Sequence, residues 1–200
     1  TTVYAVVAGG MRPGSPGRPW RGPVLSVVMP VATRWPLVGR RDELDRFTRA
    51  LADPGCQALC IYGPPGVGKT RLADECLDVA VATGRRGLRA AADRAGGEIP
   101  FGPIVHLLPT SVLSELRDDG ATGPGAFARL LDGTRDALAP AAGESGVPVL
   151  VLDDAHQVDD WSLRVIDRLL AGGLLFCIAT IVGGEAAPET VVRWWRDERG

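Results

Sequence analysis

The sequence predicts an α/β fold with three layers, in which a mostly parallel central sheet lies between two layers of helices. Two observations lead to this prediction. Short apolar segments recur at residues 57–62, 147–152 and 174–182, and each is followed by apolar residues at helical spacing. This alternation is typical of βαβ units, and strands that are apolar on both faces belong in a parallel sheet covered on both sides.

The elements of the first half are predicted in order along the chain. Residues 1–33 contain five prolines and show neither helical nor alternating periodicity, so we expect a disordered leader before an ordered domain at 34–200. A helix through Leu51 presents Leu44 and Phe47 on one face, and the turn at 53–55 closes it. The strand at 57–62 precedes a helix that runs to about Thr83, and a second strand is expected at 87–92.

The second half contains a less regular middle and a clearly patterned end. Helical segments are predicted at 104–108, 112–116 and 126–138, separated by Gly/Pro turns. The strand at 147–152 ends in two acids, and a helix with Leu163, Ile166 and Leu170 on its core face follows. A further strand is expected at 174–182 and a last helix at 188–199.

The composition excludes several classes of function. The formal charge of −2 and the pI near 5.7 give no basic surface, so we expect no direct nucleic-acid binding by this segment. No segment approaches the ~20 apolar residues of a membrane span. The first ten residues lack the positive charge that begins a signal peptide. We therefore expect a cytoplasmic protein that does not contact membranes.

The four cysteines carry no metal-binding pattern. They are scattered through apolar segments without a CxxC pair, which is typical of small buried side chains in a reducing compartment. The alternative is a metal site through Cys56 and Cys60, but no second pair of ligands accompanies them. The residues are Cys56, Cys60, Cys76 and Cys177.

One octapeptide between a predicted strand and a predicted helix satisfies GxxxxGK[ST] at every fixed position. Its glycines allow backbone N–H groups to converge on a phosphate chain, and the helix that follows adds its positive dipole end. A lysine for the β- and γ-phosphates and a hydroxyl for Mg²⁺ complete the motif. A chance Gly/Pro turn is the alternative in a chain with 26 Gly and 16 Pro, but both flanking elements favour the phosphate loop. The predicted nucleotide-binding residues are Gly63, Pro64, Pro65, Gly66, Val67, Gly68, Lys69, Thr70 and Arg71.

Asp153 and Asp154 end a buried parallel strand, at the sheet edge where the phosphate loop is also expected. Asp153 has the position of the Walker B acid and is predicted to hold Mg²⁺ together with Thr70. The alternative is a pair of surface acids without a ligand. Of the two histidines, His156 could sense the nucleotide or only cap its loop, and His106 is predicted to be structural.

The chain resembles an AAA-type ATPase module of the signalling P-loop NTPases, and most closely the large ATP-binding regulators of the LuxR family. The resemblance rests on LVGRRDEL at 37–44, the octapeptide at 63–70, EIPFG at 98–102 and the segment 149–160. It implies base contacts from Val38, Gly39 and Arg40. It also implies a catalytic role for Lys69 and for Asp154, which would polarise the attacking water. Relatives often carry a basic residue where this chain reads Ile181-Val182-Gly183-Gly184-Glu185, so the usual sensor-type contact to the γ-phosphate lacks its residue here.

The resemblance implies a C-terminally truncated P-loop NTPase fold, because the lid, the repeat region and the DNA-binding helix-turn-helix would lie beyond Gly200. We expect an ATP/ADP-binding, Mg²⁺-dependent switch that hydrolyses slowly, since Asp154 is one methylene shorter than the usual Glu. Its partners would be a second copy or regulatory proteins, and it would reach DNA only through the absent domain. The alternatives are a rapidly cycling AAA+ enzyme, such as an origin-binding or remodelling ATPase, and an inactive fragment.

Overall fold

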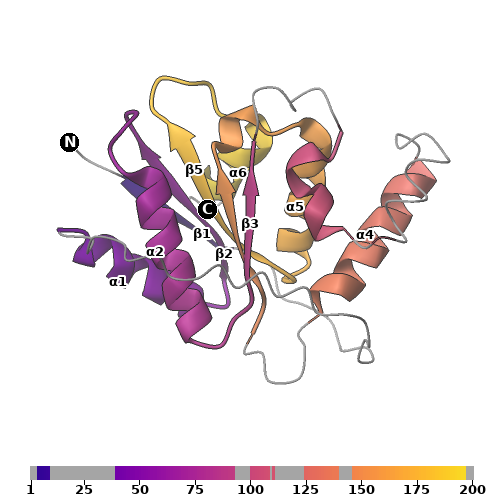
Figure 1. The fold of residues 1–200 in the computed structure, drawn as a ribbon, viewed down its shortest axis with the longest axis horizontal. Coiled ribbons are helices and arrows are strands. Elements are labelled where there is room, and N and C mark those ends of the chain that lie inside the picture. Colours follow the sequence, from indigo (N-terminus) through magenta and orange to yellow (C-terminus); the bar gives the residue numbers. More distant parts are fainter. Residues whose placement is uncertain are drawn as a thin grey trace.

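The structure, a computed structural model, describes residues 4–9, 39–92, 100–108, 110, 124–139 and 146–196 (Figure 1). Its centre is a five-stranded sheet with the order β1-β2-β5-β4-β3. Four strands are mutually parallel, and β1 runs antiparallel to β2. The predicted α/β fold with a mostly parallel sheet is confirmed. The strands are β1 (Tyr4–Gly9), β2 (Cys56–Gly63), β3 (Gly87–Ala91), β4 (Val149–Asp153) and β5 (Phe176–Val182).

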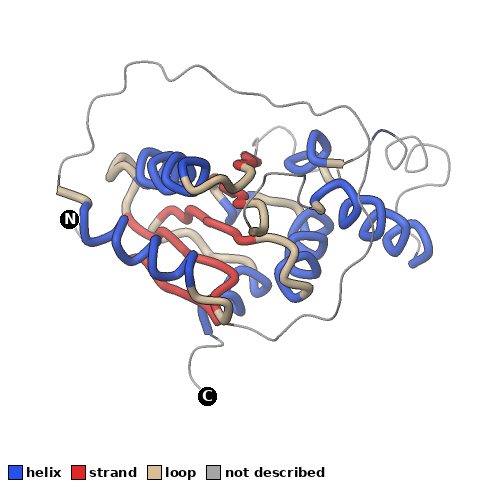
Figure 2. Tube along the Cα trace, turned by 90° about the horizontal axis from the view of Figure 1, so that it is seen from below, coloured by secondary structure: helices blue, strands red, loops and turns tan. Residues whose placement is uncertain are grey.

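Helices cover both faces of the sheet, as the tube view shows (Figure 2). The helices α1 and α2 contact one another and lie on one face, whereas α5, α6 and η1 pack on the other, with α4 outside α5. The helix predicted at 126–138 is confirmed as α4. The segment predicted at 104–108 is a 3-10 helix, and the one predicted at 112–116 lies outside the described residues. The helices are α1 (Arg41–Ala52), α2 (Lys69–Ala82), η1 (Gly102–Leu107), α4 (Pro124–Leu138), η2 (Ala155–Gln157), α5 (Asp160–Ala171) and α6 (Glu189–Arg196).

The parallel strands are apolar on both faces and therefore build two cores. In β4, Val149 and Val151 pack towards α1 and α2, while Leu150 and Leu152 pack towards α5. All four side chains are completely buried. Each contributes roughly 1.5–3 kcal/mol by leaving water. Because successive side chains of a strand point to opposite faces of the sheet, only every second residue can reach the face on which α2 lies.

Strand β1 corrects the prediction of a leader without regular structure. Its backbone pairs with β2 from Tyr4 opposite Tyr62 to Gly9 opposite Cys56, with a shift in register at the last pair. The prediction is thus wrong for residues 4–9, and the rest of 1–33 lies outside the described residues. Because β1 pairs along the outer side of β2, it satisfies backbone groups that an edge strand would otherwise expose.

The register brings the carboxyl ends of the parallel strands to one edge of the sheet. Gly63 at the end of β2 pairs with Val182 of β5, and Asp153 at the end of β4 pairs with Ala91 of β3. Ligands of open α/β sheets bind at such an edge. The predicted phosphate loop and the predicted acids are therefore neighbours.

Candidate nucleotide-binding site

The loop between β2 and α2 depends on two glycines for its shape. Gly66 and Gly68 have φ angles of +73° and +89°, in the left-handed region that favours glycine. No other atom lies within 4 Å of a Cβ built at either position, so the requirement is conformational rather than steric. Gly68 immediately precedes α2, whose first turn carries backbone N–H groups without intrahelical partners. The local geometry is thus of the kind that suits anion binding at a helix N-terminus.

Lys69 folds back onto this loop. Its side chain is buried, and Nζ donates hydrogen bonds of 3.0 Å to the carbonyl oxygens of both Gly63 and Pro64. The Gly63 oxygen also accepts a bond of 2.8 Å from the backbone N–H of Gly183, which anchors the loop to the end of β5. The ammonium group is therefore satisfied by backbone carbonyls, which phosphate oxygens can replace.

The Asp153 carboxylate is shared by groups from three other elements. Its Oδ1 accepts bonds from the hydroxyls of Thr70 on α2, at 3.1 Å, and of Thr180 on β5, at 2.6 Å. Its Oδ2 lies 3.4 Å from an Nη2 of Arg89 on β3. The structure thus brings together Thr70 and Asp153, the two residues predicted to hold Mg²⁺, although 83 positions separate them in the chain.

Thr180 was missed by the sequence reasoning. Besides donating to Asp153, its hydroxyl accepts a bond of 2.9 Å from the backbone N–H of Asp154. Asp154 adopts φ 51° and ψ 50°, a left-handed conformation that Asp tolerates better than most residues. Thr180 therefore fixes both acids. The available signal was a single hydroxyl inside the apolar segment 174–182, which is otherwise unexplained in a buried strand.

Arg40 contacts the loop backbone. Its Nη2 donates to the carbonyl oxygen of Val67 at 3.1 Å, and its Nη1 pairs with Glu43 at 2.9 Å. Burial raises the pKa of Glu43, but hydrogen bonds from Arg40 and from its own backbone, with the charge of Arg40, outweigh burial and hold that pKa below its usual value. Gly39 is exposed with φ +79°, and Val38 lies outside the described residues. The Arg40 guanidinium thus positions the loop in this structure.

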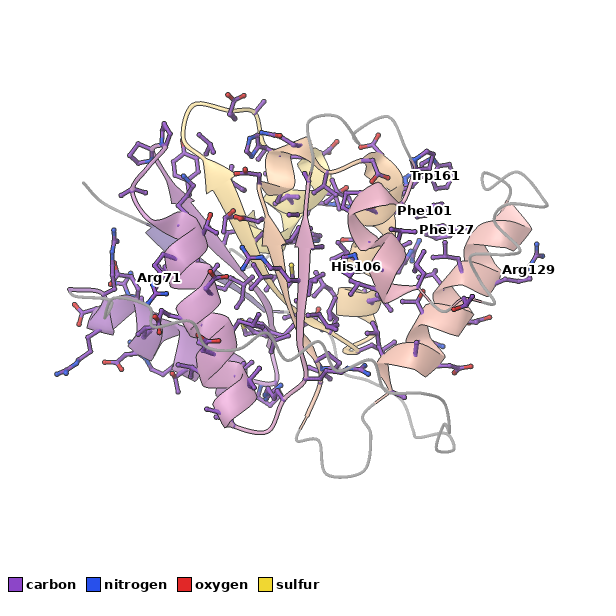
Figure 3. All side chains as sticks on the ribbon, viewed as in Figure 1. Arg71, Phe101, His106, Phe127, Arg129 and Trp161 are labelled. Carbon is purple, nitrogen blue, oxygen red and sulfur yellow. The ribbon has the colours of Figure 1, made fainter. Side chains whose placement is uncertain are left out.

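The remaining polar candidates lie around this centre. Arg71 pairs with Glu75 one turn further along α2 (Figure 3). His156 lies 3.0 Å from the Gln157 amide through Nε2, while its Nδ1 is buried and has no partner among the described residues. His106 donates from Nε2 to the Arg89 carbonyl oxygen at 2.5 Å, so it ties η1 to β3. This contact agrees with the structural role predicted for His106.

The cysteines do not form a metal site. Cys56 packs in the core beside α1 and α2, whereas Cys60 packs in the opposite core. Burial raises the pKa of the Cys60 and Cys76 thiols to about 12, and it also raises the pKa of Cys177. All four thiols are free and buried, as predicted. The thiols of Cys60, Cys76 and Cys177 are therefore protonated core side chains near neutral pH.

The residues at the sheet edge fit Mg²⁺ bound together with phosphates. No group of three or more His, Cys, Asp or Glu side chains in the described part of the chain could hold a metal by itself. Mg²⁺ in nucleotide sites usually has only one or two protein ligands, with phosphates and waters completing its shell. The adjacent oxygens of Thr70 and Asp153 match that requirement.

Comparison with known proteins supports a nucleotide-binding ATPase. No significant match was found among curated proteins. Among the described helices, none combines the length and apolar character needed to cross a membrane. The family model described as the AAA ATPase domain matches residues 36–175, which include the phosphate loop, Arg89 and both acids. Members of this family bind nucleotide, usually with Mg²⁺. Since the matched residues make up more than half of the chain, the chain belongs to the AAA ATPase domain family.

Proposed function

We propose that this domain binds ATP with Mg²⁺ and acts as a slowly hydrolysing switch. The observation that carries the proposal is the convergence of the loop at 63–68, the Lys69 ammonium, the Thr70 hydroxyl and the Asp153 carboxylate at one sheet edge. A phosphate chain bound with Mg²⁺ needs all four of these features, which the loop after β2, the first turn of α2 and the end of β4 supply here.

Each residue has a distinct role in this proposal. Backbone N–H groups of the loop bind the phosphates, and Lys69 exchanges its two carbonyl partners for phosphate oxygens. Thr70, through its hydroxyl oxygen, and Asp153, through its carboxylate, would hold the metal. When bound, Mg²⁺ would neutralise charge on the phosphates. Arg40 keeps the loop in place through the Val67 carbonyl.

Asp154 is the proposed acceptor of a proton from the attacking water. Its backbone is fixed by Thr180, so its short side chain starts from a defined position. Because that side chain is one methylene shorter than Glu, we expect the carboxylate to lie too far from an ideal water for fast turnover. Slow hydrolysis suits a switch, in which the bound nucleotide defines the state for a long time.

The biological setting we propose is a transcriptional regulator that self-associates or binds protein partners according to its nucleotide. This part of the proposal rests on the resemblance of residues 37–44 and 149–160 to the large LuxR-family regulators. A helix-turn-helix encoded downstream in the reading frame would support the regulator, and its absence there would count against it.

The chain offers an unusually selective test of ATP binding, because Lys69 is its only lysine. An amine-acylating reagent, read by peptide mass spectrometry, can modify only Lys69 and the N-terminal amine. Mg²⁺-ATP should protect Lys69 and leave the N-terminal amine unprotected as an internal control. Equal acylation of Lys69 with and without saturating nucleotide would refute the site.

Turnover distinguishes a switch from a cycling enzyme. Lys69→Ala should weaken binding of a fluorescent ATP analogue, whereas Asp154→Asn should preserve that binding and slow phosphate release. We expect the unmodified protein to release phosphate much more slowly than once per second. Turnover of many per second would instead establish the cycling enzyme.

A further inference from the structure

Arg89 is the charged residue of β3 that faces the proposed site. It pairs in register with Val151, two residues before Asp153, so the period of two places Arg89 and Asp153 on the same face of the sheet. That face is covered by α2, while the next residue, Ala90, is buried in the opposite core. The strand therefore directs a long cationic side chain towards the Walker B acid.

The Arg89 guanidinium lies between two carboxylates. Its Nη1 pairs with Asp74 on α2, and its Nη2 lies 3.4 Å from Oδ2 of Asp153. The Arg89 side chain is 40% exposed, whereas the two carboxylates are 15% and 16% exposed. The backbone is held separately, because the Arg89 carbonyl oxygen accepts a bond from His106. The side chain can consequently change partners while β3 stays in register.

We propose that Arg89 competes with Mg²⁺ for the Asp153 carboxylate, and that Asp74 is the second partner that holds the guanidinium when the metal binds. The proposal rests on the proposed function, since it concerns the metal of that site. A guanidinium and a divalent cation repel each other at one carboxylate, so metal binding must displace Arg89 from Oδ2. Asp74 lowers the cost of that displacement because it already pairs with the other arm of Arg89. Arg89 is in this sense a positioning residue that sets the Mg²⁺ concentration at which the site is loaded.

The experiment is a Mg²⁺ titration of the full chain with a fixed concentration of mant-ATP, starting in EDTA and read by fluorescence. Arg89→Gln should lower the Mg²⁺ midpoint roughly fivefold, as expected for loss of a partly exposed charge pair. Asp74→Asn should raise the midpoint by roughly threefold to fivefold. Arg129→Gln and Asp132→Asn are the matched controls. They make the same charge changes on α4, and Figure 3 shows Arg129 on the opposite side of the molecule from α2. We expect both controls to leave the midpoint unchanged.

Simple attraction between Asp74 and the metal would also raise the midpoint of Asp74→Asn, so the decisive measurement is a double-mutant cycle. If Asp74 acts by holding Arg89, Asp74→Asn should shift the midpoint less than twofold in the Arg89→Gln background. Equal shifts in both backgrounds would overturn the proposal. Should Arg89→Gln not fold, judged by circular dichroism in EDTA, Arg89→Lys replaces it, since one ammonium cannot span both carboxylates. The shift caused by Asp74→Asn is then compared between the unmodified and the Arg89→Lys backgrounds, and equal shifts again overturn the proposal.

The titration also separates this proposal from the proposed function. If the unmodified protein does not bind mant-ATP at any Mg²⁺ concentration, the nucleotide site itself is refuted. If it binds with a measurable midpoint but Arg89→Gln behaves like Arg129→Gln, only the competition is refuted. Thermal unfolding in EDTA gives an independent readout. Relative to the unmodified protein, Arg89→Gln should lower the melting temperature in EDTA, and the decrease should be smaller at saturating Mg²⁺-ATP. If Arg89 had only a structural role, the decrease would be the same in both conditions.

Discussion

Replacing Thr180 with valine should destabilise the protein by about 2–3 kcal/mol. Valine has nearly the same shape and suits a strand, so the change removes the hydroxyl and little else. Two hydrogen bonds disappear, one to the Asp153 carboxylate at 2.6 Å and one from the Asp154 backbone N–H at 2.9 Å. A bond to a charged group contributes about 1.5–3 kcal/mol, and an N–H left without a partner in a buried setting costs about 1–3 kcal/mol. The two contributions add to about 2.5–6 kcal/mol, and we expect a loss at or slightly below the lower end of that range, because both acids are partly exposed and water can replace some of the lost bonding.

Urea unfolding followed by tryptophan fluorescence measures this loss. With a slope of about 2 kcal/mol/M, the midpoint should fall by about 1–1.5 M. Thr134→Val is the matched control, because Thr134 is also buried and its hydroxyl donates to the Leu130 carbonyl oxygen within α4. That carbonyl has its own helical partner, so the control should lose less than about 1 kcal/mol. A Thr180→Val protein no less stable than Thr134→Val would refute the reasoning that Thr180 fixes the two acids.

Three further predictions concern the loop and the core. The pKa of Glu43 is below its usual 4.5, so its pair with Arg40 stabilises the fold above pH 4.5 and this stabilisation is lost as the pH falls through the lower folded pKa. When urea unfolding is measured at decreasing pH below 4.5, Glu43→Gln should therefore lose less stability than the unmodified protein. Equal losses in the two proteins would contradict this. Burial raises the pKa of Cys60 and Cys76 to about 12, so Ellman's reagent at pH 8 should react slowly with the native protein. After unfolding, the reagent should label all four thiols rapidly. Rapid labelling of the native protein would show that these thiols are accessible. Gly68→Ala should cost about 1–2 kcal/mol because of its φ of +89°, whereas Gly125→Ala in α4 should be neutral or stabilising; similar urea midpoints for the two variants would argue against a strained loop.

Local pattern was sufficient to predict most of the fold. The strands β2, β4 and β5 are continuous apolar segments, and only a strand buried on both faces needs such a sequence. Strand β1 could not be predicted in the same way. Its segment is short and is followed directly by a stretch rich in glycine and proline, and its pairing with the edge of β2 identifies it as a strand. The 3-10 geometry of η1 likewise depends on tertiary contacts, with Phe101 in a left-handed conformation just before it.

The candidate site residues that lie close together in the sequence could be predicted, whereas those brought together by the pairing of strands could not. The octapeptide is recognisable by itself, because its glycines, lysine and threonine lie within a few residues of one another. Thr180 and Arg89 carry no motif, and they matter only because β5 and β3 flank β4 and direct those side chains to the face covered by α2. For Arg40, the base contact that the resemblance implies stays a prediction, and the structure adds a contact of its guanidinium with the Val67 carbonyl oxygen of the loop. A sequence motif can name the residues near a ligand without specifying which of them contact it.

The contacts of Asp153 explain why metal binding at this site should be coupled to a change of side-chain partners around it. Its carboxylate is contacted by donors from three elements, through Thr70 on α2, Thr180 on β5 and Arg89 on β3. A hydroxyl that donates to Asp153 can offer a lone pair to a metal, but a guanidinium has no acceptor and can only leave. Metal binding therefore keeps Thr70 in place while it releases Arg89 towards Asp74. Because β3 also carries the bond from His106 to η1, that release occurs next to the segment that links the sheet to the α4–α5 side of the domain.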